Sequence, residues 1–146
     1  MEMRELNESK VCDILNKIVE LEMAGVVRYA HSSLMITGPN RIPIVAFLQE
    51  QATESLQHAL QAGEYITGFE GHPSQNISHI EENHNHSVHQ ILQESLEHEM
   101  KAVEKYKELL DEVADASIML EEYARGQIGM EEQHALEIRK MLIDYS

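Results

Sequence analysis

The chain has 146 residues, of which 42% are hydrophobic and 25% charged, and its formal net charge is −15. This charge argues against nucleic acid and anionic membrane surfaces as partners, because both would repel the protein, and it suits a protein that attracts cations. No apolar run is long enough to span a membrane, so we expect one domain over residues 1–146 with no membrane segment. The only cysteine, Cys12, permits no internal disulfide, and the N-terminus lacks an apolar signal segment. Both features favour the cytoplasm.

The composition favours helix, with only three prolines and no tryptophan. Turn residues predict two long helices over about residues 9–36 and 42–68, separated by Thr37-Gly38-Pro39-Asn40, with Asn7 or Ser9 as the first N-cap. Two more are predicted over about residues 87–113 and from an N-cap at residues 115–117 to about residue 144. Residues 69–84 are too many and too polar for a tight turn, and we expect them to return along the bundle. These elements predict an all-α, antiparallel four-helix bundle with one long crossover.

Polar side chains interrupt the apolar stripe of each predicted helix. Glu22 lies between Ile18 and Gly25, and Glu99 lies at the centre of its stripe, whereas His98 lies about 100° away around the helix. The remaining inward positions belong to His58 and to the Glu-x-x-His pair Glu131 and His134. Buried carboxylates and imidazoles are costly unless something compensates them. Their convergence from four helices predicts an internal metal site formed by Glu22, His58, Glu99, Glu131 and His134.

These motifs resemble the bacterioferritins of the ferritin-like di-iron family, over nearly the whole chain. The family's first-helix ligand falls on Glu22 at the end of residues 14–22, and its following aromatic residue falls on Tyr29. The third-helix ligand falls on Glu99, in Leu96-Glu97-His98-Glu99, and the second Glu-x-x-His falls on Glu131 and His134. The first Glu-x-x-His falls on Ser55-Leu56-Gln57-His58, where the histidine is kept. The resemblance implies a ferritin-like bundle.

The chain departs from this pattern at several positions. Ser55 stands where the family has a glutamate that bridges two irons, and a hydroxyl is a poorer iron ligand than a carboxylate. Glu54 is adjacent and is an alternative ligand, although the helical wheel places it about 80° from the stripe centre. Leu56 replaces the haem-binding methionine, so we expect no haem. Only twelve residues follow His134, so we expect no fifth helix, which leaves a large cage uncertain. The absence of a Cys-x-x-Cys pair excludes a rubredoxin-like module.

The resemblance implies a metal-binding protein that holds iron, as a pair or as a single ion, with manganese or zinc as alternatives. Its implied reaction is a weakened ferroxidase activity, in which Fe²⁺ is oxidised by O₂ or peroxide, in iron oxidation and storage. The resemblance also implies a homodimer, because the first two helices of the family pair between subunits. Tyr29 is expected to be a packed core residue with a hydrogen-bonded hydroxyl. The alternative function is a non-enzymatic ferritin-like dimer with a degenerate site, and a peroxidase or manganese-catalase-like use is a third.

A second group of polar residues covers residues 79–89, where several histidines alternate with glutamate and asparagine. These side chains are suitable ligands for Zn²⁺, Ni²⁺ or Fe²⁺. Their spacing fixes no ligand set, and a solvated crossover is the favoured interpretation.

Overall fold

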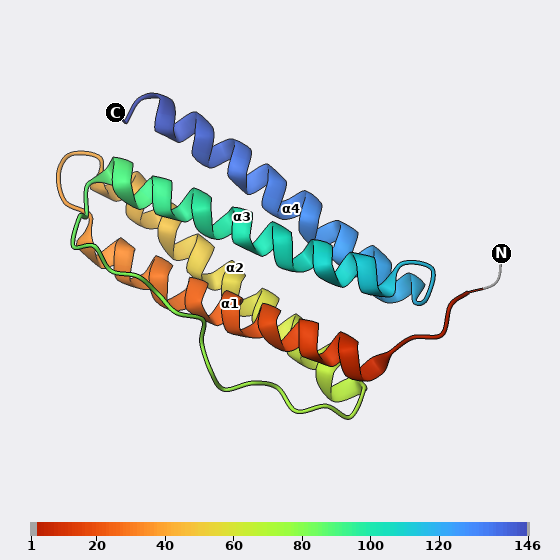
Figure 1. The fold of residues 1–146 in the computed structure, drawn as a ribbon. Helices are drawn as coiled ribbons and strands as arrows, with labels where there is room; N and C mark the ends of the chain where they lie inside the picture. Colours follow the sequence, from red (N-terminus) through yellow and green to blue (C-terminus); the bar gives the residue numbers. More distant parts are fainter. Residues whose placement is uncertain (1–2, 146) are drawn as a thin grey trace.

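The computed structural model describes residues 3–145 as four long helices and no strand (Figure 1). The helices are α1 (Glu8–Met35), α2 (Arg41–Gly68), α3 (Val88–Val113) and α4 (Ile118–Ile143). The all-α bundle predicted from the sequence is therefore confirmed, with each helix beginning and ending close to its expected position. The domain expected over residues 1–146 includes Met1, Glu2 and Ser146, which lie outside the described residues.

Side-chain caps explain where three of the helices begin. The Asn7 side chain accepts a hydrogen bond from the Lys10 amide at 3.0 Å, which decides between the two caps expected for α1. Ser87 accepts from the amide of Gln90 before α3, and Ser117 accepts from the amide of Leu120 before α4. Each cap satisfies one of the amides that the first turn of a helix leaves without a partner.

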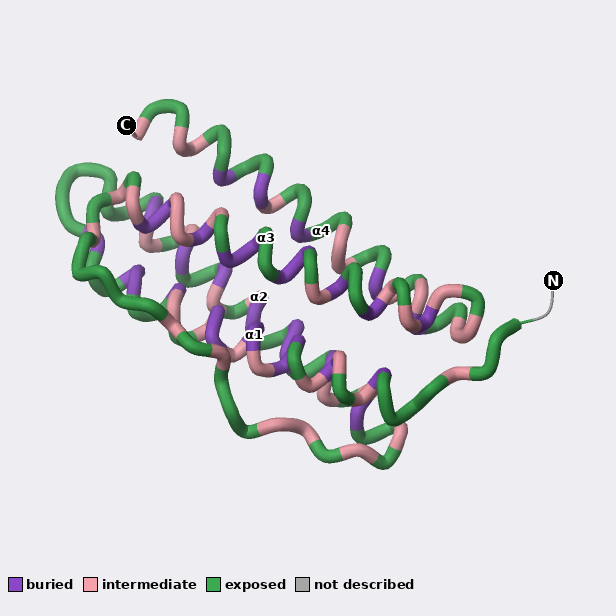
Figure 2. The backbone as a smooth tube through the Cα atoms, in the orientation of Figure 1, coloured by how far each residue is buried: buried purple, intermediate pink, exposed green. Residues whose placement is uncertain are grey.

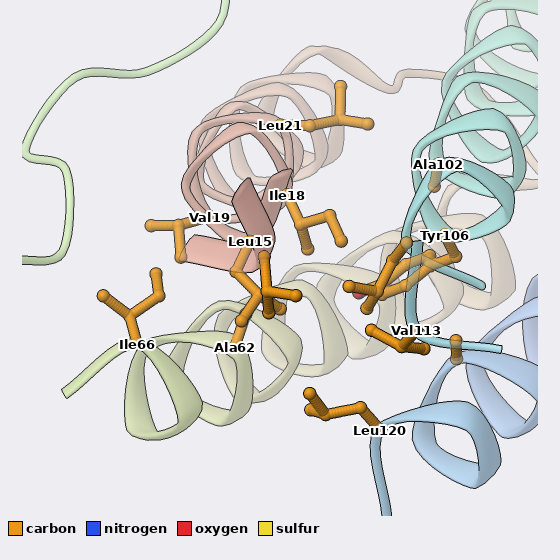
Figure 3. Packing of buried hydrophobic residues seen from close by; sticks show 13 residues of the cluster. Leu15, Ile18, Val19, Leu21, Ala62, Ile66, Ala102, Tyr106, Val113 and Leu120 are labelled. Carbon is orange, nitrogen blue, oxygen red and sulfur yellow. The ribbon is translucent and has the colours of Figure 1, made fainter. Parts of the chain in front are cut away.

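The four helices pack as two pairs with a polar region between two apolar clusters. α1 packs on α2, α3 packs on α4, and α1 also contacts α3. The buried faces point toward the bundle interior, as the purple segments of Figure 2 show. One apolar cluster lies around Leu15, Ile66 and Leu120, whose side chains converge between the helices in Figure 3. The other lies near the opposite ends of α1 and α2, around Ile36 and Leu48. The polar site described below lies between these clusters.

The crossover from α2 to α3 runs alongside α1 (Figure 1), as the sequence predicts. The Ser74 amide donates to Asn16 Oδ1 at 2.7 Å, and the Asn16 side chain donates back to the His72 carbonyl at 3.1 Å. Glu20 accepts hydrogen bonds from the Ser74 hydroxyl and, through its carbonyl, from the Ser78 amide. These contacts attach the crossover to the outer face of α1. Within residues 3–145, no helix combines the length and the apolarity that crossing a membrane requires.

Candidate metal centre

All five residues of the predicted site converge at the middle of the bundle. Glu22, His58, Glu99 and Glu131 are buried, each with at most 8% of its surface exposed. His134 is half-buried at the rim of the site. These side chains come from all four helices, as the apolar stripes predict.

The first of two ligand groups consists of Glu22, His58 and Glu131. His58 Nδ1 lies 2.7 Å from Glu22 Oε2 and 3.3 Å from Glu131 Oε1. Tyr106 donates its hydroxyl hydrogen to Glu22 Oε2 at 3.1 Å. One ligand atom from each of the three residues lies within 4.8 Å of the others, which is close enough for a shared metal ion.

The second group consists of Glu99, Glu131 and His134, and it also satisfies the 4.8 Å limit. His134 Nδ1 lies 3.8 Å from Glu99 Oε2 and 3.6 Å from Glu131 Oε2. Tyr29 donates a 2.5 Å hydrogen bond to Glu99 Oε1 and is fully buried, which confirms its expected role in the core.

Glu131 belongs to both groups and directs one carboxylate oxygen toward each histidine. Within residues 3–145, Glu131 Oε2 and His134 Nδ1 are buried atoms with no hydrogen-bond partner. Buried polar atoms rarely lack partners, and two such atoms 3.6 Å apart leave room for a cation to bind both. The donor set therefore fits two metal ions that share the carboxylate of Glu131.

Electrostatics within the cluster favour a protonated His58. Burial disfavours the imidazolium, but contacts with Glu131 and Glu22 outweigh burial and raise the pKa of His58 to about 10. Burial raises the pKa of Glu22. For Glu131, burial alone would raise the pKa, but the imidazoles of His134 and His58 outweigh it and lower the pKa. His58 thus supplies a positive charge between two buried carboxylates.

The structure places both Ser55 and Glu54 against the site, in different ways. Ser55 is buried, as its position in the stripe predicts. Glu54 is half-buried on the flank of α2, and its Oε2 atom lies 3.1 Å from His134 Nε2. Glu54 therefore contacts the outer nitrogen of the imidazole, while Nδ1 faces Glu99 and Glu131.

His98 is a buried histidine beside the site whose burial the sequence pattern missed. Despite its position about 100° from Glu99 on an ideal helix, its surface is only 6% exposed. Burial lowers the pKa of His98 to about 4, so the ring is neutral. A Cβ on Gly25 would lie 2.6 Å from His98 Nε2 and 2.9 Å from Ser55 Oγ. Small residues on α1 and α2 therefore make the space that the imidazole occupies.

A four-helix bundle with a long crossover and a central carboxylate–histidine cluster defines the ferritin-like class. Residues 12–145 match the model of the ferritin family, which is described as a ferritin-like domain. The chain therefore belongs to that family. Comparison with proteins of curated function gives no match.

Solved structures with the same fold have low sequence identity to the chain. A ferritin-like, diiron-carboxylate protein from Bacillus anthracis str. Ames has a TM-score of 0.86 and 19% identity, covering 92% of this chain and 96% of that one. A dodecameric thioferritin, the bacterioferritin-related protein from Bacteroides fragilis, has a TM-score of 0.86 and 19% identity, covering 96% and 88%. The Desulfovibrio desulfuricans bacterioferritin, whose diiron site is described in different catalytic states, has a TM-score of 0.84 and 18% identity, covering 92% and 79%.

Proposed function

We propose that the protein binds iron between the four helices and oxidises Fe²⁺ as a ferritin-like ferroxidase of reduced activity. One observation carries this proposal: Glu131 is shared by two three-residue groups of metal-binding side chains. A shared carboxylate is the feature that a pair of ions requires. The family and the diiron proteins of the same fold support iron as the metal.

In this proposal, Glu22 and His58 bind one Fe²⁺, Glu99 and His134 bind the other, and Glu131 bridges them. As substrate, each Fe²⁺ gives one electron to O₂ or peroxide. Tyr106 and Tyr29 orient the carboxylates of Glu22 and Glu99 by donating hydrogen bonds to them. Glu54 Oε2 lies 3.1 Å from Nε2 of His134, and Nδ1 on the other side of the ring is available to the metal.

The reduced activity follows from Ser55. The resemblance places a second bridging carboxylate at this position. The neutral hydroxyl of Ser55 stands in its place, so the site lacks one negative charge that would stabilise Fe³⁺. We therefore expect a functional but slower site.

Addition of Fe²⁺ to the metal-free protein in air tests the proposal. We expect uptake of about two Fe²⁺ per chain at the two groups, and an oxo-bridged ferric absorption that appears faster than in buffer. Glu131→Gln should abolish this uptake, whereas Glu132→Gln, on the exposed face of α4, should retain it. Oxidation no faster than in buffer would remove the ferroxidase function.

A non-enzymatic, degenerate site is the second candidate function, and the salt bridges of His58 favour it. A protonated His58 already compensates Glu22 and Glu131 without any metal. If this function is the correct one, Glu131→Leu combined with His134→Leu should raise stability, because packing would replace buried polar groups. Loss of a metal-dependent stabilisation in the same variant would count against it.

The proposal includes a cytoplasmic homodimer without bacterioferritin-type haem. Exposed apolar residues of α2, Leu56 and Leu60, supply a surface for pairing. Leu56 offers no sulfur ligand to a haem iron. The thioferritin of the same fold is a dodecamer.

A further inference from the structure

We propose a second metal site on the surface, formed by His31 of α1 and by Glu82 and His86 of the crossover, that binds a divalent cation of the Zn²⁺ class. Ligand atoms of the three residues lie within 4.8 Å of one another. The crossover histidines alone show no ligand spacing in the sequence. The fold completes the set by adding His31 from a helix more than forty residues away.

The two distances from Glu82 to the histidines match the edges of a coordination polyhedron. Glu82 Oε2 lies 2.9 Å from His31 Nε2 and 3.3 Å from His86 Nε2. Ligands at about 2.1 Å from a metal ion are separated by about 3.0 Å in an octahedron and about 3.4 Å in a tetrahedron. The centroids of the two imidazole rings are 5.6 Å apart, with an interplanar angle of 67°. A metal can therefore bind all three residues with small side-chain movements.

Neighbouring contacts hold the carboxylate in place. Glu82 Oε1 accepts a hydrogen bond from the His84 amide at 2.7 Å, which leaves Oε2 directed at the histidines. The next residue, Asn83, donates to Glu94 Oε1 of α3 at 2.9 Å. The group adjoins a hollow of about 250 Å³ between α1 and the crossover, which gives solvent ligands room to complete the coordination. The site is thus positioned by three elements.

This site is separate from the bundle centre. His31 follows Glu22 by nine residues, or about 13 Å along α1 at a rise of ~1.5 Å per residue. The His31 side chain is 49% exposed, whereas that of Glu22 is 3% exposed. Two imidazoles and one carboxylate favour Zn²⁺ and similar transition metals over Mg²⁺ or Ca²⁺, which prefer oxygen ligands. A bound ion would join the crossover to α1 and reduce the crossover's motion.

Equilibrium dialysis of the full chain with Zn²⁺ tests this site. The His31→Ala/His86→Ala variant should bind one fewer Zn²⁺ per chain than wild type. The matched control is His72→Ala/His79→Ala, which removes two exposed crossover histidines outside the group and should retain wild-type stoichiometry. The milder His31→Gln change should weaken binding at this site by at least about tenfold.

Hydrogen exchange of the crossover amides provides a second measurement, which metal binding at the bundle centre does not affect. In wild type and in the control, Zn²⁺ should slow the exchange of amides in residues 79–87, whereas in His31→Ala/His86→Ala it should not. The proposal is wrong if all three proteins bind equal amounts of Zn²⁺, or if Zn²⁺ leaves crossover exchange unchanged in wild type. Failure here would leave iron binding at the bundle centre unaffected.

Discussion

His58 carries the positive charge that compensates the buried carboxylates of Glu22 and Glu131. Its pKa is about 10 in the folded protein against an ordinary value of 6.5. This protonation stabilises the metal-free fold fully below pH 6.5 and is lost as the pH rises through about 10. A metal that binds His58 must therefore displace a proton.

Zn²⁺ binding at the bundle centre should consequently strengthen with pH. The His31→Ala/His86→Ala variant lacks the surface site, so it reports binding at the bundle centre alone. Its apparent affinity for Zn²⁺ should rise by about tenfold per pH unit between about pH 7 and 8.5, because His58 releases one proton when the metal binds. Histidines with ordinary pKa values are largely neutral in this range, so the slope comes from the histidines of the site. The contact with Glu131 also raises the pKa of His134, so a slope steeper than tenfold per pH unit would add a second released proton. Isothermal titration calorimetry in buffers of different ionisation enthalpy measures both the affinity and the proton release. A pH-independent affinity would contradict a protonated His58.

Ser55 and His98 share the space where the resemblance places a bridging carboxylate. Both reach within 3 Å of the position that a Cβ on Gly25 would take. Among residues 3–145, His98 Nε2 is one of the few buried polar atoms without a hydrogen-bond partner. A larger residue at position 55 therefore requires the imidazole to move.

Ser55→Glu alone should destabilise the fold by about 1–3 kcal/mol, because it overfills this space. Ser55→Glu/His98→Ala should recover stability relative to Ser55→Glu and should oxidise Fe²⁺ faster than wild type, because it restores the second bridging carboxylate. His98→Ala alone is the matched control and should not gain activity. Thermal unfolding and stopped-flow oxidation measure the two effects. A Ser55→Glu protein as stable as wild type would exclude the clash.

Helical periodicity was sufficient to predict the positions of Glu22, Glu99 and Glu131 in the core, because each falls on the apolar stripe of its own helix. It could not predict the burial of His98, which depends on small residues contributed by two other helices. Nor could it predict the contact between Glu54 and His134, which depends on the spacing of α2 and α4 across the rim. The burial of a side chain is predictable when it depends on the stripe of one helix. When it depends on several helices, the fold must be known.

At the level of the helices, Gly25 of α1 lies directly against side chains of α2 and α3. A methyl group there would lie 2.6 Å from the His98 ring, whose edge-to-face contact with Tyr29 restrains it. Gly126 of α4 offers the opposite case, because a Cβ there would meet no atom within 4 Å.

Gly25→Ala should therefore lower the free energy of unfolding by about 1–3 kcal/mol through overpacking. Gly126→Ala is the matched control and should raise it by about 0.5–1 kcal/mol, because alanine favours helix over glycine. Urea denaturation followed by circular dichroism measures both. Equal effects of the two substitutions would show that the α1 contact with His98 is looser than described.

The helices were predictable because their signals are local, and so were the caps Asn7 and Ser117, whose side chains accept from the amides three residues later. The general course of the crossover followed from its length. Its attachment to α1 did not, because nothing in the sequence links Asn16 and Glu20 to residues more than fifty positions later. The surface metal site of His31, Glu82 and His86 was not predictable for the same reason, since nothing in the sequence associates His31 with the crossover.

For the whole molecule, the outer face of α2 offers an apolar surface for the proposed pairing. It borders a largely apolar groove of about 330 Å³ whose lining includes Met23, Leu60 and Ile77. Leu60 is 62% exposed in the single chain. Its burial between two copies would remove apolar surface from water.

Leu60→Glu should shift the proposed dimer toward monomers, because the interface would then bury a charge. Leu136→Glu, a similar change at an exposed leucine of α4, should leave the dimer intact. Sedimentation velocity of both variants measures the assembly state. Loss of the dimer in both, or in neither, would place the interface elsewhere.

The proposed function depends on a pair of metal ions that share the Glu131 carboxylate within the bundle. Anomalous X-ray scattering from crystals loaded with Fe²⁺ tests this most directly. We predict two iron peaks, one among Glu22, His58 and Glu131 and one among Glu99, Glu131 and His134. A bundle centre without an iron peak, with His58 still between its two carboxylates, would contradict the account.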